Sequence, residues 1–170
     1  MSEVLANTYY LKALDNYPYD LPEFLESINY ALSYDNMHAD ANYLMGRFCM
    51  EQLHKYKDAE WHFETTLQSD VHHLLTLYHY IKLSIMTDQL EKARKLIAHA
   101  KNVFGVSQTD LLHREGIILE VEKKYKKALK KFKKAKDDAI FEEDVAFYTD
   151  EIKRLKGKMP RQKKKVKKRK

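Results

Sequence analysis

The chain has 170 residues, which is enough to bury a sizeable core as one domain or one short array of repeats. Only four glycines and three prolines interrupt it. A strand-rich fold needs many more turn signals, so the composition excludes one and predicts an all-α protein. The net charge of +6 hides an asymmetry, because residues 1–100 carry −6 and residues 101–170 carry +12.

The amino terminus, MSEVLANTYYLKALDNYPYD, lacks the basic start and apolar run of an export signal. No stretch of the chain is long and apolar enough to predict a membrane span. The single cysteine, Cys49, has no partner for an internal disulfide and stands among apolar residues, which predicts a buried structural thiol. We therefore expect a cytoplasmic protein, or a nuclear one if the host is eukaryotic.

A four-residue pattern recurs along the chain at intervals of 34 or 35 residues. Its offsets of three, four and three residues place all four side chains on one face of a helix, with a small residue that permits close helix packing. The first copy is degenerate, and the next three are well kept. In chain order, the copies are Leu21, Phe24, Ile28 and Ala31; Tyr56, Ala59, Phe63 and Thr66; Leu90, Ala93, Ile97 and Ala100; and Tyr125, Ala128, Phe132 and Ala135.

A second helical stretch lies upstream of each well-kept copy, and its residue pairs recur at the same interval. These pairs are Met45 and Gly46, Tyr80 and Ile81, and Glu115 and Gly116. The segments that carry both halves are ANYLMGRFCMEQLHKYKDAEWHFETTL, LYHYIKLSIMTDQLEKARKLIAHA and LLHREGIILEVEKKYKKALKKFKKA.

These segments resemble the tetratricopeptide repeat, a helix-turn-helix unit of 34 residues with the signature W-x2-L-G-x2-Y, then A-x3-F, then P. The second half of the signature is well kept, whereas the Trp and the final Pro are absent and one extra residue lies in the turn at 53–56. The resemblance implies a right-handed α-solenoid of antiparallel helix pairs, with repeats at about 5–36, 39–71, 74–105 and 108–140.

A polar-backed helix over residues 141–157 is predicted to cap the last repeat. Its apolar stripe is Phe141, Val145, Tyr148, Ile152 and Leu155, and acidic residues at its start and basic residues near its end complement the helix dipole. Gly157 is placed to stop it. We expect one repeat domain over 1–157, followed by a disordered Lys/Arg-rich tail over 158–170.

No familiar catalytic motif is present, so we expect a protein that is not an enzyme and has no cofactor. The densest histidine group is His72, His73 and His79. On a helix, His72 and His79 would lie two turns or about 10 Å apart, which is too far for one zinc ion. We therefore predict no metal site, and histidines that lie on the surface or line a groove.

The resemblance implies a groove that binds a protein or peptide partner through the first helix of each repeat. An aromatic, aliphatic and cationic lining would suit apolar anchors together with a carboxylate for Arg47 or Lys82. In the alternative interpretation, several of these residues pack against the amino-terminal helix or the cap and bind nothing. The implied groove residues are Tyr43, Arg47 and Met50; Tyr78, Lys82 and Ile85; and His113, Ile117 and Glu120.

A basic surface is predicted at the carboxy-terminal end. RNA or DNA phosphates, an anionic membrane surface and a nuclear import receptor are alternative partners, and a merely solubilising tail is the fourth possibility. Nucleic acid leads these alternatives, and its binding would be sequence-tolerant and salt-dependent. The residues concerned are Lys123, Lys124, Lys126, Lys127, Lys130, Lys131, Lys133 and Lys134 in the repeat, and Arg161, Lys163, Lys164, Lys165, Lys167, Lys168, Arg169 and Lys170 in the tail.

The sequence thus predicts a non-enzymatic scaffold or adaptor that binds a protein partner in its groove, with a basic tail that has affinity for polyanions. The alternative function is association with RNA or DNA, in which the basic third repeat and the tail form the main binding surface. The sequence does not indicate the partner or the oligomeric state.

Overall fold

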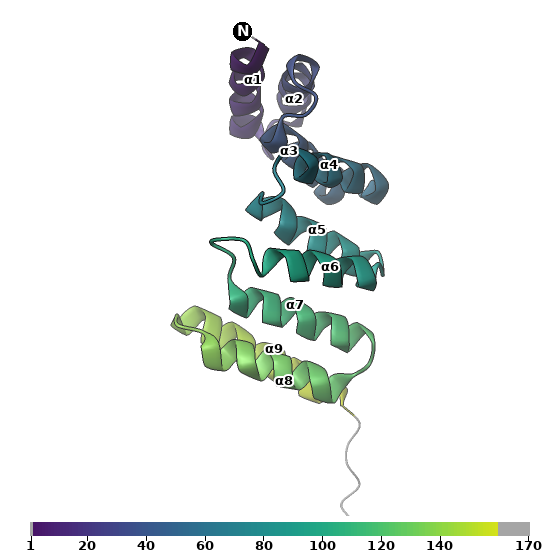
Figure 1. Ribbon diagram of the computed structural model, residues 1–170, viewed down its shortest axis with the longest axis vertical. Coiled ribbons are helices and arrows are strands. Elements are labelled where there is room, and N and C mark those ends of the chain that lie inside the picture. Colours follow the sequence, from purple (N-terminus) through teal and green to yellow (C-terminus); the bar gives the residue numbers. More distant parts are fainter. Residues whose placement is uncertain (1, 160–170) are drawn as a thin grey trace, which may run out of the picture. The chain divides into compact units, whose positions relative to one another are not determined.

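The computed structural model describes residues 2–159, and in this range it contains helices and no strand (Figure 1). The predicted all-α class is confirmed, whereas the basic residues of the predicted tail from Arg161 onward lie outside the described residues. The helices are α1 (Ser2–Asn16), α2 (Leu21–Tyr34), α3 (Ala39–Glu51), α4 (Tyr56–Ser69), α5 (Leu74–Met86), α6 (Leu90–Ala100), α7 (Gln108–Val121), α8 (Tyr125–Asp138) and α9 (Glu142–Lys158).

The described helices fall into two compact units. The first, within Met1–Val106, contains α1 to α6, and the second, from Ser107 onward, contains α7 to α9. In the first unit α1 packs on α2, α3 on α4 and α5 on α6. In the second unit α8 packs against both α7 and α9. Each pair is joined by a short turn and is antiparallel (Figure 1), so the fold is a helical repeat, consistent with an α-solenoid.

The repeating small residues lie at the centre of each helix pair. Ala59, Ala93 and Ala128 are all 0% exposed. The bulky residue four positions later is also buried in each copy, as Phe63, Ile97 and Phe132 are at most 2% exposed. The stripe that the sequence periodicity predicts is therefore the packing face of the second helix in each pair.

Glycine on the first helix provides the space for phenylalanine on the second. A Cβ atom at Gly46 would lie 2.7 Å from Phe63 Cε1, and one at Gly116 would come still closer to the Phe132 ring. The middle copy has Ile81 in place of the glycine and the smaller Ile97 in place of the phenylalanine. The apparent departure from the repeat signature is therefore accompanied by a smaller side chain on the opposite helix.

The turns inside the pairs α3–α4, α5–α6 and α7–α8 each contain one left-handed residue. His54, Asp88 and Lys123 have φ angles of 53°, 58° and 59° and occur 34 and 35 residues apart. A left-handed residue just past a helix end commonly terminates the helix, and these residues lie two or three positions after the last residue of their helices. The turn at 52–55 has four residues, against three at 87–89 and at 122–124, so the predicted extra residue is confirmed.

In two pairs the first helix, α3 or α5, begins at a histidine N-cap, which sequence reasoning missed. The Nδ1 atoms of His38 and His73 accept hydrogen bonds from the backbone N–H groups of Ala41 and Thr76, each 3.2 Å long. Ser107 caps α7 in the same way. The His73 ring therefore satisfies a helix terminus.

Helix α9 packs Tyr148, Ile152 and Leu155 into the second unit, where all three are buried. Two details of the predicted capping helix are wrong. Phe141 is 67% exposed and precedes the helix as its N-cap residue, and the helix continues through Gly157 to Lys158. The buried apolar stripe of α9 is therefore shorter than the sequence pattern indicates, because Phe141 precedes the helix.

Candidate partner-binding surfaces

Arg47 on α3 is held by groups of its own unit. Its Nη2 atom lies 3.1 Å from Glu51 Oε2, and its guanidinium carbon lies 5.1 Å from the centre of the Tyr17 ring. The Tyr17 hydroxyl donates a 2.7 Å hydrogen bond to the same carboxylate oxygen. Arg47, Glu51 and Tyr17, which directly follows α1, therefore form a polar cluster that joins α3 to the amino-terminal helix.

Burial and hydrogen bonding determine which groups of this cluster are charged. Burial raises the pKa of Glu51, but hydrogen bonds from Arg47 and Tyr17 outweigh that effect and lower it overall. Burial is also the main reason why the pKa of His79 lies below its ordinary value. The His79 Nε2 atom is 3.6 Å from Glu51 Oε1. At neutral pH the cluster therefore holds an ionised carboxylate beside the guanidinium and a neutral imidazole.

The first three predicted groove residues lie largely inside the protein. Tyr43 is 6% exposed, and Met50, at 3%, belongs to the hydrophobic core. Arg47 is half-buried against Tyr17. Met50 is therefore in the core rather than on a surface. Arg47 has the surroundings that the alternative interpretation describes, whereas Tyr43 contacts the His73 and His79 rings of the next helix pair.

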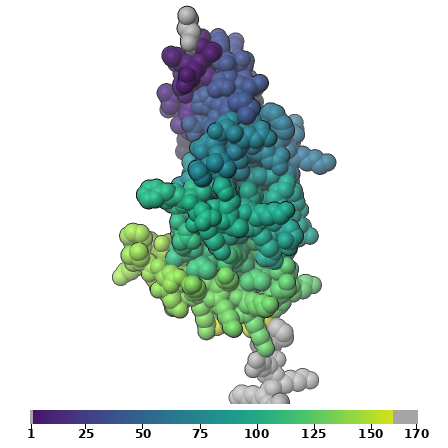
Figure 2. Space-filling model, viewed as in Figure 1, coloured from purple at the N-terminus to yellow at the C-terminus, as the bar shows by residue number. Residues whose placement is uncertain are grey.

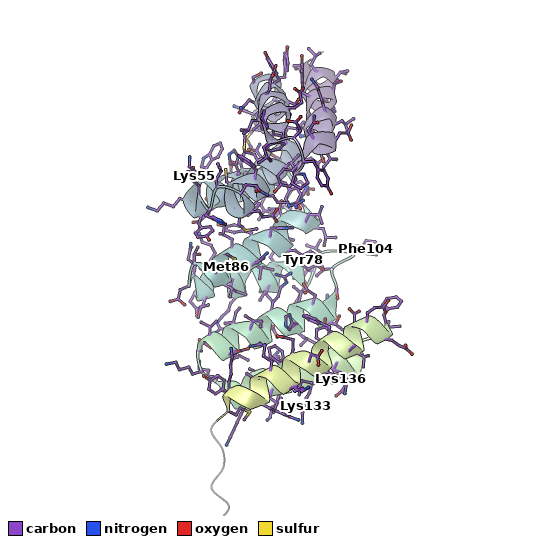
Figure 3. The ribbon with its side chains drawn as sticks, turned by 180° about the vertical axis from the view of Figure 1, so that it is seen from behind. Lys55, Tyr78, Met86, Phe104, Lys133 and Lys136 are labelled. Carbon is purple, nitrogen blue, oxygen red and sulfur yellow. The ribbon has the colours of Figure 1, made fainter. Side chains whose placement is uncertain are left out.

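The second set, on α5, is more accessible. Lys82 is exposed and forms no ion pair in the described part of the chain. Tyr78 and Ile85 are half-buried, and Met86 is 52% exposed. Figure 3 shows Tyr78 and Met86 along this helix. Because residues 78, 82, 85 and 86 are spaced by three or four positions, they share one face of α5.

The third set, on α7, is covered by α9. His113 Nε2 lies 3.1 Å from Glu151 Oε2, and the His113 ring contacts the Phe147 and Tyr148 rings at 5.1 Å and 5.8 Å. Glu120 accepts two 2.6 Å hydrogen bonds from Arg154 and one of 2.8 Å from Lys158. His113 and Glu120 therefore bind the chain's own last helix.

An open pocket of about 450 Å³ remains in the second unit. The predicted groove residues Ile117 and Glu120 help to line it. Hydrogen bonds from Arg154 are the main reason why the pKa values of Glu120 and Glu151 lie below the ordinary range, so both carboxylates are ionised and neutralised internally. The complete lining is Ile117, Glu120, Val121, Tyr125, Glu151, Arg154 and Lys158.

The predicted basic face lies on α8, and its lysines differ in their surroundings. Lys131 pairs with Glu115, and Lys124 lies 3.2 Å from a Glu122 oxygen. Figure 2 shows long side chains of the light-green segment that includes α8 projecting from the surface, and Figure 3 labels Lys133 on this helix. The lysines that are exposed without an ion pair in the described range are Lys123, Lys126, Lys127, Lys130, Lys133 and Lys134.

A second pocket, of about 330 Å³, lies between α2, α3 and α4, and sequence reasoning missed it. Trp61, the only tryptophan of the chain, is 59% exposed at this pocket. The sequence signal that could have revealed this pocket is Trp61 itself, an aromatic residue at a helix position where packing does not require one. The lining residues are Leu25, Asn29, Met45, Phe48, Cys49, Leu53, Lys55, Asp58, Trp61 and His62.

Burial governs the titratable groups beside Trp61. It lowers the pKa of His62 to about 4 and raises the pKa of the Cys49 thiol. Cys49 is 5% exposed, which confirms the predicted buried thiol. The charge at this pocket at neutral pH therefore comes from Lys55 and Asp58.

None of the described helices combines the length and the apolar character that crossing a membrane requires. A search of curated proteins finds no match. The solved structure of the "MamA RS-1 ArsTM double mutant" is similar, with a TM-score of 0.63, 14% identity, and coverage of 92% of this chain and 95% of that chain. At this identity the likeness shows the helical-repeat fold alone.

The profile of the family described as "TT21 fifth ARM repeats domain" matches residues 39–152, which is more than half of the chain. The predicted resemblance is thus confirmed as membership of a helical-repeat family, while the matching family is one of ARM repeats rather than tetratricopeptide repeats. The chain belongs to the family of the TT21 fifth ARM repeats domain.

Proposed function

We propose that the protein is a non-enzymatic scaffold or adaptor that binds a protein partner. Helical-repeat folds commonly present extended surfaces to other proteins, and each helix pair can contribute contacts of its own. The family match and the helical-repeat neighbour both support this class of function. The single buried cysteine agrees with a reducing compartment such as the cytoplasm.

The surroundings of Lys82 are the reason why we propose α5 as the partner-binding face. Its ammonium group has no carboxylate partner in the described range, in contrast to Arg47, which is paired internally. Tyr78 precedes Lys82 by four residues, and Met86 follows it by four, so apolar groups flank the charge on one helical face. This face suits a partner segment that combines an apolar side chain with a carboxylate.

The test is affinity purification of the full-length protein from its host, after nuclease treatment, with Lys82→Glu as the variant. Lys95→Glu is the matched control, because Lys95 is also exposed, has no ion pair among residues 2–159 and lies on α6 of the same unit. We expect Lys82→Glu to lose protein partners that Lys95→Glu retains. Retention of every partner by Lys82→Glu and by Met86→Asp would remove α5 as the binding face.

A second candidate function is binding to RNA or DNA through α8, and the position of Lys130 favours it. Lysines stand three and four residues before and after Lys130, at 126, 127, 133 and 134. Like charges at these spacings destabilise a helix by about 0.2–0.5 kcal/mol each. The packing of α8 on α7 and α9 does not require them, so a polyanionic ligand would supply the missing counter-charge.

This candidate is tested with a single-stranded RNA oligomer in a salt titration. The triple variant Lys126→Gln, Lys130→Gln and Lys133→Gln is compared with Lys57→Gln, Lys82→Gln and Lys95→Gln, which removes three exposed lysines of the first unit. If α8 contacts phosphates, the α8 variant should lower the slope of log affinity against log salt by about 2, and the control should not. Equal slopes for both variants would refute the role of α8.

A further inference from the structure

The pocket beside Trp61 has a mainly apolar floor and an exposed rim. Met45, Phe48 and Cys49 are each at most 9% exposed and form the floor. Trp61 and Leu53 are 59% and 44% exposed at the same pocket. Large apolar side chains that are exposed next to a concavity are the usual anchors of protein interfaces.

The internal repeat provides the comparison that shows Trp61 to be exceptional. Trp61 stands two residues after Ala59 of the packing stripe. The equivalent positions in the other copies hold Glu26, Lys95 and Lys130, all charged and exposed. A charged residue therefore satisfies the fold at this position, and packing of the helix pair does not account for tryptophan in this copy.

The turn that borders the pocket is also specific to this copy. It is the turn with the extra residue, and both Leu53 and Lys55 lie in it. The Leu53 and Lys55 backbone N–H groups donate to the Phe48 and Cys49 carbonyls at 3.2 Å and 2.9 Å, so the lengthened turn is held against α3. The lengthened turn thus places Leu53 beside Trp61, next to Lys55, which holds the position of Gln89 and Lys124 in the other copies.

The charged residues of the pocket have no internal counterpart. Lys55, labelled in Figure 3, and Asp58 form no ion pair in the described part of the chain. Lys55 can pair with a carboxylate of a ligand by donating hydrogen bonds to it, while Asp58, three residues later, would repel a second acidic group. A ligand with one acidic residue next to its apolar anchor is therefore complementary to Lys55.

We propose that this pocket docks a peptide segment of a protein partner, in which a bulky apolar residue fills the space between Leu53 and Trp61 and a neighbouring Asp or Glu pairs with Lys55. The inference rests on the proposed scaffold function, because it requires that the protein binds a protein partner. It uses a different surface from Lys82 on α5, and the Lys82→Glu variant leaves this pocket intact, so each proposal can fail without the other.

The experiment is selection of phage-displayed random 12-residue peptides on the full-length protein. Synthetic versions of the selected peptides are then titrated by fluorescence, because Trp61 is the only tryptophan and reports this pocket directly. Leu53→Lys is the blocking variant, and Leu75→Lys is its control, because Leu75 is similarly exposed, at 50%, and lies outside the pocket. Lys55→Glu tests the charge contact.

We expect selected peptides to share a bulky apolar residue beside Asp or Glu and to shift the Trp61 emission. Leu53→Lys should weaken their binding at least tenfold, and Leu75→Lys should leave it unchanged. Lys55→Glu should also weaken it, and exchange of the peptide's acid for Lys should restore affinity for that variant. The proposal is overturned if no peptide is enriched, or if enriched peptides bind Leu53→Lys normally. It is also overturned if the Trp61 emission changes with protein concentration alone, because a second copy would then occupy the pocket.

Discussion

Gly46 on α3 lies directly against the Phe63 ring on α4, so closely that a Cβ atom at position 46 would be 2.7 Å from Phe63 Cε1. Gly116 on α7 has the same relationship with Phe132 on α8. Both phenylalanines are 0% exposed and enclosed by core side chains. The absence of a side chain on one helix therefore sets how deeply the ring of the next helix can be buried.

Alanine at Gly116 should destabilise the protein. A methyl group in a filled core forces the Phe132 ring to move, which costs about 1–3 kcal/mol, and the higher helix propensity of alanine offsets about 1 kcal/mol of this. We expect a net loss of up to about 2 kcal/mol in the free energy of unfolding, measured by urea denaturation of the full-length protein.

Gly157→Ala is the matched control, because a Cβ atom there would meet nothing within 4 Å and the residue lies in α9. This variant should be stabilised by up to about 1 kcal/mol. If Gly116→Ala were as stable as Gly157→Ala, the close contact with Phe132 would not determine the packing of this helix pair.

His62 should make the first unit sensitive to mild acid. Burial lowers its pKa from 6.5 to about 4 in the folded protein, so the neutral imidazole favours the folded state. Its contribution is fully present above pH 6.5 and is lost progressively as the pH falls through 4. Between pH 7 and pH 5 the loss should be about 2 kcal/mol in the free energy of unfolding.

The variant His62→Gln should remove this part of the pH dependence. Its free energy of unfolding at pH 7 and at pH 5, followed by circular dichroism and Trp61 fluorescence, is compared with that of the original protein. Other groups, including His79, remain in both proteins and cancel from the comparison. An unchanged difference between the two pH values would show that His62 is not buried as a neutral group.

Lys130→Glu should stabilise the second unit although it alters no packed residue. The substitution converts four repulsive contacts, with the lysines at 126, 127, 133 and 134, into attractive ones. The expected gain is about 2 kcal/mol at low salt, read as a higher midpoint of thermal unfolding, and it should shrink in 1 M NaCl.

Lys131→Glu is the control for Lys130→Glu, because Lys131 pairs with Glu115. It places a second carboxylate beside the first and should lower the thermal midpoint. If α8 binds polyanions, Lys130→Glu should be more stable and bind more weakly than the original protein. Equal thermal midpoints for the two glutamate variants would mean that the lysines of α8 do not repel one another measurably.

Tyr17→Phe should weaken the connection between α1 and α3. The change removes the 2.7 Å hydrogen bond to Glu51 and keeps the ring on which Arg47 lies. We expect a loss of about 1–2 kcal/mol in the free energy of unfolding, since the acceptor is charged. Tyr19→Phe, at a residue 91% exposed, should have no effect, and equal behaviour of the two variants would exclude a structural role for the Tyr17 hydroxyl.

The sequence by itself determined the helix pairs and their packing stripes. Ala59, Ala93 and Ala128 recur at the period of the fold, and helical periodicity alone places the bulky residue four positions later on the same face. The extra turn residue and the buried Cys49 were also predictable, because spacing and neighbouring residue types are properties of the chain order.

Only the tertiary structure decided which of the predicted groove residues remain available to a partner. Arg47 meets Tyr17, 30 positions earlier, and Glu120 meets Arg154, 34 positions later. The repeat pattern describes each helix and its immediate partner, but it does not specify the long side chains that cross from one pair to the next element. For the same reason the sequence did not reveal the pocket at Trp61, since its wall combines three helices and a turn whose side chains converge only when those helices pack.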